Sequence, residues 1–199
     1  MGTADSSNSI PDSTVPDSIF RELVDIIARS RNSANTIACA IPRRAAVVME
    51  HFFKQAHEKV CILTPDLQEA IYATPEVIAA ATHFLRNDSM GKIELLVKEG
   101  FDAAAHPLIT ALRAAGFQDR VDLWSVPKHI LIGCGGNFAV ADARHVRMQT
   151  TDTTAIAHFW NPKLGADVQG IFDDVKSRSR SLPLTIGGRP QRAEMHATA

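Results

Sequence analysis

Residues Lys59-Val60-Cys61-Ile62-Leu63-Thr64, followed at once by Pro65-Asp66, form the stretch that decides the fold class. A short apolar run that ends in a turn signal is typical of a buried strand. A second strand is predicted at Lys92–Val97, and Val121–Val126 alternates like a strand with one face in contact with water. Helices, marked by apolar residues at three- and four-residue steps, are predicted between these strands at about 75–85 and 106–115. Strands and helices that alternate in this way predict an α/β domain with parallel strand pairs.

The chain before this stretch is expected to begin without structure and then to become helical. Residues 1–17 contain four Ser, two Pro and three Asp, so we predict a disordered lead-in there. The elements predicted next are a helix at about 19–29, a strand within 34–41 and a helix at about 43–56.

The pattern changes after Pro127. His129–Ile132, Asn137–Ala141 and His145–Thr150 are three short strand-like runs, and the links between them suit hairpins. A strand at about 156–160 and a closing helix at about 163–175 complete the predicted elements. We therefore predict a mixed, mainly parallel central sheet flanked by helices on both faces.

The predicted domain organisation is a single α/β domain over residues 18–178, followed by a basic flexible tail at 179–199. Five cations and one acidic residue lie between Lys176 and the last residue, so this stretch carries a net charge of +4. Its Pro and Gly residues favour a chain without regular structure.

Composition limits the class of protein. The 199 residues include 21 Lys and Arg against 22 Asp and Glu, a balance unlike that of a strongly basic nucleic-acid binder. The longest apolar runs are far shorter than the roughly 18 residues that a membrane span needs. Cys39, Cys61 and Cys134 show no Cys-x-x-Cys spacing, which favours a reducing cytoplasm over a disulfide framework or a zinc site.

The order of elements over residues 43–178 resembles one half of a protein of the phospholipase D-like superfamily. The runs that carry the resemblance are Asn137-Phe138-Ala139-Val140-Ala141-Asp142, His145-Val146-Arg147 and Ile171-Phe172-Asp173-Asp174. Active members of that superfamily use a His-x-Lys motif, followed after four residues by Asp. The resemblance implies that such a histidine attacks a phosphodiester, that the lysine neutralises its oxygens, and that two copies face each other in a dimer or pseudo-dimer.

This sequence departs from the His-x-Lys motif. Neither possible frame supplies the family's residues: His129, Leu131 and Gly136 occupy the three positions in one, and Asn137, Ala139 and Arg144 in the other. An apolar side chain at the lysine position cannot hold a phosphate. We therefore predict a degenerate active site with no catalytic residue.

Six polar side chains after residue 128 are candidates for ligand binding: His129, Asn137, Asp142, His145, Arg147 and His158. On a strand His145 and Arg147 would share one face, so an imidazole and a guanidinium could converge on an anion. The alternative is structural, with Asp142 holding the backbone of a turn and Arg147 ion-paired on an exposed strand. The histidines do not fall at a recognised metal-ligand spacing, and no metal or cofactor is predicted.

Two functions remain open from the sequence. The first is a non-catalytic phospholipase D-like module that acts as a cytoplasmic regulatory or adaptor protein, as a homodimer or as a subunit of a larger assembly. The second is a metal-independent phosphodiesterase or nuclease, or a nucleic-acid-binding protein, that uses the candidate His and Arg residues in a rearranged site. Its ligand would be nucleic acid or another phosphate-bearing molecule, and neither hypothesis involves a membrane.

Overall fold

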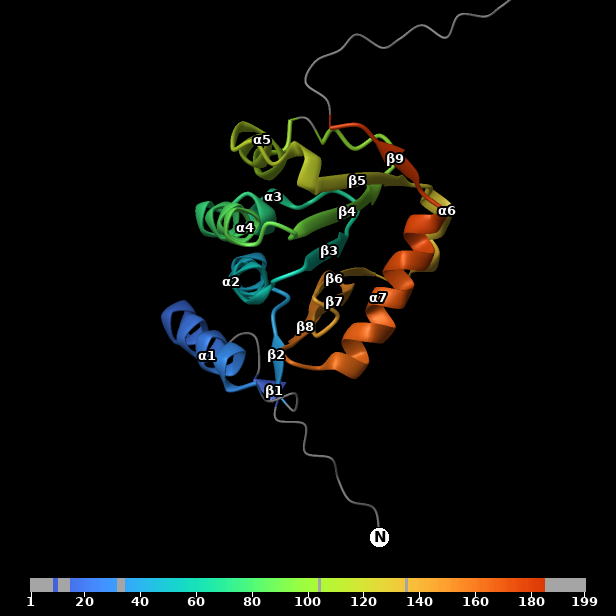
Figure 1. Ribbon diagram of the computed structural model, residues 1–199. Coiled ribbons are helices and arrows are strands. Elements are labelled where there is room, and N and C mark those ends of the chain that lie inside the picture. The colour runs from blue at the N-terminus through green and yellow to red at the C-terminus, as the bar shows by residue number, and fades with distance from the viewer. Residues whose placement is uncertain (1–8, 11–14, 32–34, 104, 135, 185–199) are drawn as a thin grey trace, which may run out of the picture.

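The computed structural model describes residues 9–10, 15–31, 35–103, 105–134 and 136–184. These residues form one mixed sheet with helices on both faces (Figure 1). Nine strands of this described part of the chain pair in the following order: β1 (Ser9–Ile10), β2 (Thr36–Ala38), β8 (Thr154–His158), β7 (His145–Thr151), β6 (Asn137–Ala141), β3 (Lys59–Leu63), β4 (Lys92–Lys98), β5 (Val121–Val126) and β9 (Arg180–Leu182).

Parallel pairing is the minority arrangement among the described strands. The pairs β1–β2, β3–β4 and β4–β5 are parallel, whereas the other five neighbouring pairs are antiparallel. The expectation of a mixed sheet is confirmed, but the expectation of a mainly parallel one is wrong. The physical reason is the run β6–β7–β8, because strands joined by tight turns must alternate in direction. β6 also enters the sheet antiparallel to β3.

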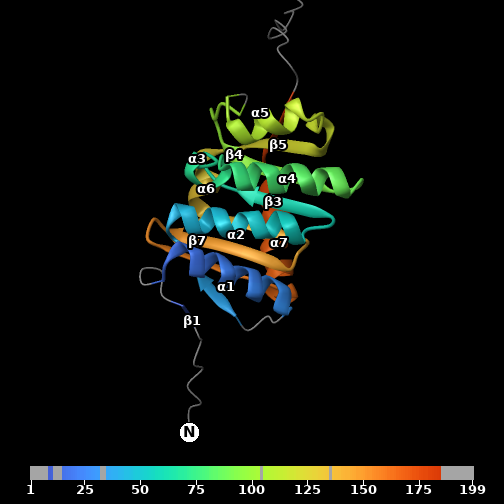
Figure 2. The same ribbon diagram turned by 90° about the vertical axis from the view of Figure 1, so that its left-hand side faces the viewer.

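The helices lie on two sides of the sheet. Those on one face are α1 (Asp17–Ser30), α2 (Pro42–Gln55), α3 (Glu69–Tyr72), α4 (Pro75–Asn87) and α5 (Pro107–Ala114). Figure 2 shows α1, α2, α4 and α5 side by side across that face. The opposite face carries α6 (Lys128–Gly133) and α7 (Pro162–Ser177), and a 3₁₀ turn at Gln118–Arg120 precedes β5.

Proline opens four of these helices, α2, α4, α5 and α7. Its fixed φ suits the first helical position, and the N–H that it lacks would have no partner inside the helix. The side chains of Thr74 and Asn161 cap α4 and α7 by accepting hydrogen bonds from the backbone N–H groups of Val77 and Leu164. None of the described helices is long and apolar enough to span a bilayer.

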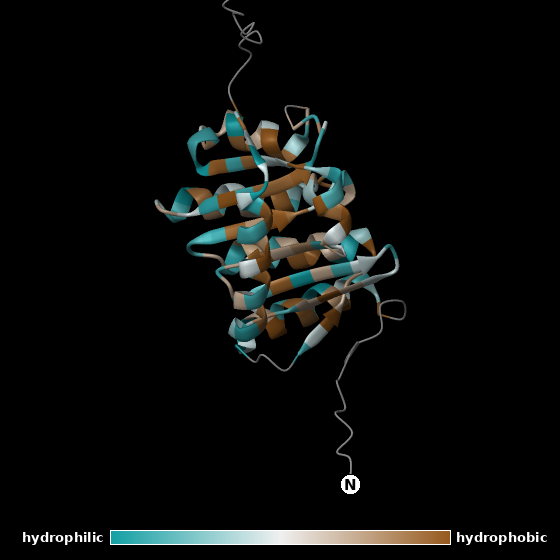
Figure 3. Ribbon diagram, turned by 90° about the vertical axis from the view of Figure 1, so that its right-hand side faces the viewer, coloured by the Kyte–Doolittle hydropathy of each residue, from teal (hydrophilic) through white to brown (hydrophobic). Residues whose placement is uncertain are grey.

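The sheet separates two apolar clusters. On β3, Val60 and Ile62 belong to the larger cluster beneath α1–α5, whereas Cys61 and Leu63 belong to the smaller cluster beneath α6 and α7. Successive strand residues point to opposite faces, so a strand buried on both sides is apolar throughout. Figure 3 shows apolar residues concentrated along the strands of the sheet.

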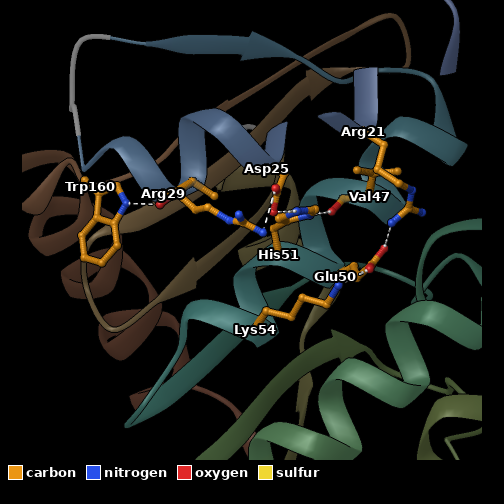
Figure 4. Close-up of polar contacts among 9 residues, drawn as sticks. Arg21, Asp25, Arg29, Val47, Glu50, His51, Lys54 and Trp160 are labelled. Carbon is orange, nitrogen blue, oxygen red and sulfur yellow. Dashed lines mark hydrogen bonds and ion pairs between the residues drawn. The ribbon is translucent and has the colours of Figure 1, made fainter. Parts of the chain in front are cut away.

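Polar contacts fix α1 against α2 at one side of the sheet (Figure 4). Arg21 Nη1 and Lys54 Nζ lie 2.5 Å and 2.6 Å from the two carboxylate oxygens of Glu50. Burial alone raises the pKa of Glu50, but the hydrogen bonds from Lys54 and Arg21 outweigh it and leave that pKa below its usual value. Beside this group, His51 Nε2 lies 3.6 Å from Asp25 Oδ1. The two helices are therefore joined by charge as well as by apolar packing.

Three segments differ from the sequence-based expectations. The run His129–Ile132 lies in helix α6 rather than in a strand, because β5 is already paired with β4 on one side and with β9 on the other. β9 lies inside the segment 179–199 that was expected to be a flexible tail, and β1 lies inside the lead-in 1–17. Residues 1–8, 11–14 and 185–199, also within those segments, lie outside the described residues.

Candidate ligand-binding site

The hairpin strands divide the candidate residues between the two ends of the sheet. Asn137 begins β6 opposite Gln149, whereas His145 begins β7 opposite Ala141 at the other end of the same strand pair. His158 ends β8 and pairs with Val146, close to the end that holds His145. The six side chains predicted as ligand-binding candidates therefore do not form one site.

His129 is separated from the others because it lies on α6, outside the sheet. It is exposed and lines a cleft of about 470 Å³ between α6 and α7. Cys134, Asp174 and Arg178 line the same cleft. Sequence reasoning missed this arrangement because it placed residues 129–132 in a strand. Among the described residues, no three His, Cys, Asp or Glu side chains gather where they could hold a metal ion.

Asp142 has a structural role in the turn between β6 and β7. Its carboxylate accepts hydrogen bonds of 2.8, 2.9 and 2.9 Å from the backbone N–H groups of His57, Glu58 and Lys59. Both central residues of the turn, Asp142 and Ala143, have positive φ values of 49° and 50°. This is the geometry of the tight hairpin turn whose twist matches that of the flanking strands. Asp142 therefore has a structural role, but the backbone that it holds is that of residues 57–59 at the start of β3 and not its own turn, as the structural alternative expected.

His145 is a core residue. Its ring lies among the aromatic rings of Phe52, Phe159 and Trp160, at centroid distances of 5.9, 5.5 and 4.6 Å. The backbone N–H of Trp160 donates to Nδ1 over 3.4 Å, while the buried Nε2 has no hydrogen-bond partner among the described residues. Burial lowers the pKa of His145 to about 4, so the imidazole is neutral at pH 7. It is shut off from any substrate by the rings around it.

Arg147 is also buried, with 1% of its surface exposed. Its Nη2 donates to Gln149 Oε1 over 3.0 Å, and its Nε has no hydrogen-bond partner within the described ranges. The expectation of an ion-paired arginine on an exposed strand is wrong, because this face of β7 is turned into the core, where His145 on the same face packs against Phe52 of α2. A buried guanidinium with a neutral partner is energetically costly. His145 and Arg147 do share a strand face, but that face lies in the core.

Ala139 occupies the lysine position of the family motif in the frame that begins at Asn137. It is fully buried on β6 and is the direct partner of Arg147 across the β6–β7 pair. The Asn137 side chain, which takes the histidine position, is partly exposed at the start of β6. The remaining candidate, His158, has its Nδ1 3.4 Å from Thr36 Oγ1, and burial lowers its pKa.

Comparisons with known proteins show one family match and several structures of similar fold. Residues 42–114, from the first residue of α2 to the last of α5, match the model of a family described as a domain of unknown function (DUF7931). A search of the curated proteins found no match.

Three solved structures are similar to this chain. The first is a phospholipase D family member, Nuc from Salmonella typhimurium, with 11% identity and a TM-score of 0.49 over 68% of this chain and 89% of that one. The second is TrmBL2, an archaeal chromatin protein, with 9% identity and a TM-score of 0.52 over 83% of this chain and 62% of that one. The third is NucT from Helicobacter pylori, with 12% identity and a TM-score of 0.48 over 74% of this chain and 98% of that one.

At these identities the likeness concerns the arrangement of helices and strands, and no activity is carried over with it. The described part of the chain has the single mixed sheet, with helices on both faces, that the element order predicts. What is shown of the fold is therefore an α/β arrangement, one mixed sheet flanked by helices, over the described residues.

Proposed function

We propose that this chain is a non-catalytic phospholipase D-like module that acts by association, as a cytoplasmic regulatory or adaptor protein. The observation that carries this proposal is Ala139, a fully buried methyl group at the position where the family's lysine would hold a phosphate. The amide of Asn137 replaces the histidine two residues earlier. Covalent phosphodiester chemistry needs an activated nucleophile together with a group that stabilises the developing charge, and an amide supplies neither nucleophile nor cation.

The other candidate histidines support the same conclusion. His145 is enclosed by aromatic rings, and His129 lies on a helix rather than on a strand beside a cation. Arg147 lies beside Ala139, but it is covered by the core. No candidate histidine is therefore paired with an accessible cation in the way that the family's motif would require.

The α6–α7 face is the surface that we expect to mediate self-association. Ile132 on α6 and Ile171 on α7 are large apolar side chains with 72% and 49% exposure. Ile171 lines the α6–α7 cleft together with Asp174 and Arg178, so the cleft holds apolar area and charges of both signs. Asp174 and Arg178 pair with each other within one chain. A second copy related by two-fold symmetry would therefore bury the exposed isoleucines against each other rather than neutralise free charges.

Light scattering at micromolar protein concentration tests the association. We expect the full chain to have the mass of a dimer or larger assembly, and the double variant Ile132→Asp, Ile171→Asp to have the mass of a monomer. Ile26→Asp is the matched control, because Ile26 is 64% exposed on α1, on the other face of the sheet. A monomeric full chain would contradict the homodimer.

Turnover of a chromogenic phosphodiester and of single-stranded DNA tests the absence of catalysis. We expect no turnover with the pure full chain, with or without divalent metal ions or EDTA. Turnover that is abolished by His129→Ala or His158→Ala would instead establish the rearranged enzyme.

A second candidate function, nucleic-acid binding, is favoured by one comparison. TrmBL2, whose structure is described as showing a novel mode of DNA binding, covers 83% of this chain. Fluorescence anisotropy with labelled duplex DNA over a range of salt concentrations tests this candidate. Binding that weakens steeply with salt would support it, because phosphate contacts release counterions.

A further inference from the structure

A pocket lined by two arginines lies at the end of the sheet opposite Asn137, where three segments meet. These are the end of α1, the turn between β6 and β7, and the link from β8 to α7. The pocket has a volume of about 330 Å³, and its walls are formed by Arg31, Asp142, Ala143, Arg144, Trp160 and Pro162. Its residues are distinct from those that carry the proposed function above.

Two guanidinium groups lie over the indole of Trp160. The guanidinium carbons of Arg31 and Arg144 are 5.2 Å and 5.9 Å from the ring centroid. The indole is fixed in place, since its Nε1–H donates to the backbone oxygen of Ala28 over 2.5 Å (Figure 4). The ring of His145 packs edge-on against it from the core. Cation–π contact with the same fixed ring keeps both guanidiniums at the wall of this one pocket.

The pocket has a surplus of positive charge. Among the described residues, neither Arg31 nor Arg144 forms an ion pair. Asp142 is the one acidic residue of the pocket wall, and its carboxylate is engaged by three backbone N–H groups. Pro162, at the first turn of the 16-residue helix α7, adds the positive end of the helix dipole.

Backbone strain is concentrated around this pocket. Five non-glycine residues of the described chain have positive φ, and four of them line the pocket: Arg31, Asp142, Ala143 and Trp160. Close packing supports these conformations, because a Cβ at Gly165 of α7 would lie 2.1 Å from the backbone oxygen of Ala143. Such strain persists only where the surrounding structure imposes it, and it clusters at ligand sites.

We propose that this pocket binds the terminal phosphate group of a small phosphomonoester, held between the guanidiniums of Arg31 and Arg144 beside the first turn of α7. A phosphomonoester carries a charge of about −1.5 to −2 at pH 7 and offers three acceptor oxygens, which two planar guanidiniums can share. The ligand is recognised by its phosphate rather than by a stacked base, because the guanidiniums already lie over the indole.

Fluorescence of Trp160 tests this proposal directly. The chain has two tryptophans, so Trp124→Phe leaves Trp160 as the only indole. We expect saturable fluorescence changes on titration with inorganic phosphate and with adenosine monophosphate at low ionic strength, and none with adenosine. Calorimetric titration of the unaltered chain with the same probes checks that Trp124→Phe has not changed the site.

Charge removal identifies the binding residues. Arg31→Gln and Arg144→Gln should each weaken binding of adenosine monophosphate about tenfold or more, the usual effect of losing one charge-assisted contact. The matched control is Arg86→Gln, which removes an exposed arginine from α4 and should leave binding unchanged.

Three outcomes would overturn the proposal. These are equal binding of adenosine and adenosine monophosphate, unchanged binding in both pocket variants, or no saturation by either phosphate probe. A further experiment compares the binding of an oligothymidylate with and without a 5′-phosphate. Equal affinity of the two oligonucleotides would exclude recognition of a terminal phosphate. None of these results depends on the mass or turnover measurements that test the proposed function.

Discussion

Ala139 on β6 and Arg147 on β7 are direct partners in the antiparallel pair, so a buried guanidinium lies beside the methyl group that takes the family's lysine position. The guanidinium of Arg147 carries a positive charge but has almost no access to solvent. Its neighbour Gln149 supplies one neutral acceptor. A phosphate could reach this arginine only if the core around it opened.

We predict that Arg147→Met raises the free energy of unfolding, by about 1–3 kcal/mol. Replacing a poorly compensated buried charge with an apolar side chain of similar volume is often stabilising. Arg147→Ala should instead destabilise the chain, because it leaves a cavity. Urea unfolding measures both variants. A loss of stability in Arg147→Met would show that the guanidinium has a better partner than Gln149.

We predict that Asp142→Ala lowers the free energy of unfolding by about 2–4 kcal/mol, because three backbone N–H groups lose a charged acceptor. Asp142→Asn should cost less, since asparagine keeps one acceptor oxygen and tolerates the left-handed conformation of the turn. Asp152→Ala, an exposed aspartate of the next turn, is the matched control for urea unfolding. Equal losses in Asp142→Ala and Asp152→Ala would contradict the role of the Asp142 carboxylate.

The buried His145 predicts a stability that falls with acid. Burial depresses its folded-state pKa from 6.5 to about 4, so the unfolded chain binds the proton more readily. The stability that the neutral ring contributes is fully present above pH 6.5 and is lost as the pH falls toward 4. The loss amounts to about 3 kcal/mol. Burial lowers the pKa values of His106 and His158 too, which adds to the loss in the same direction.

Unfolding of His145→Phe as a function of pH checks this prediction. The phenyl ring suits the aromatic surroundings and cannot titrate, so the curve between pH 6.5 and 4 should flatten. His129→Gln, which changes an exposed histidine on α6, should leave the curve as it is. An unchanged slope in His145→Phe would assign the acid sensitivity to other groups.

We predict that the ion pair between Glu94 of β4 and Lys176 of α7 stabilises the packing of α7 against the sheet. Glu94 is 5% exposed, and its carboxylate lies 2.7 Å from Lys176 Nζ and 3.7 Å from Lys59 Nζ. Lys176→Met should lower the free energy of unfolding by about 1–3 kcal/mol, because it leaves a buried carboxylate with one distant cation. In a double-mutant cycle, Glu94→Gln should remove most of that loss. Additive losses would mean that the pair does not interact.

Much of the fold could be predicted from local sequence pattern. The apolar runs that form β3 and β4 are recognisable because both strands are buried on both faces, and β5 is recognisable from its alternating pattern, which matches one buried and one half-buried face. The helices between them carry their own signals, such as Pro75 and Pro107 at the first turn. The departure from the His-x-Lys motif could also be recognised from the sequence, because the motif is defined only by residue types at a fixed spacing.

The wrong predictions concern residues whose local sequence pattern suits one structure but whose place in the folded sheet imposes another. Residues 129–132 are as apolar as a strand, but neighbouring strands already occupy both edges of β5. The prediction that Arg147 is exposed was wrong. The alternation along a strand shows which residues share a face, but it does not show which face the helices cover. The prediction for Asp142 was closer, since turn chemistry is local, but its partners lie in a distant segment of the chain.

The amino-acid sequence alone determined which segments become the central strands and helices, and that an apolar residue, Leu131 or Ala139, stands at the lysine position in either frame of the His-x-Lys motif. Only the tertiary structure decided the direction of strand pairing, the burial of His145 and Arg147, and the pocket that Arg31 and Arg144 line beside Trp160. The physical reason is that apolar periodicity and turn chemistry act over a few residues. Burial, charge pairing and aromatic contact depend on segments that the folded sheet brings together from far apart in the chain.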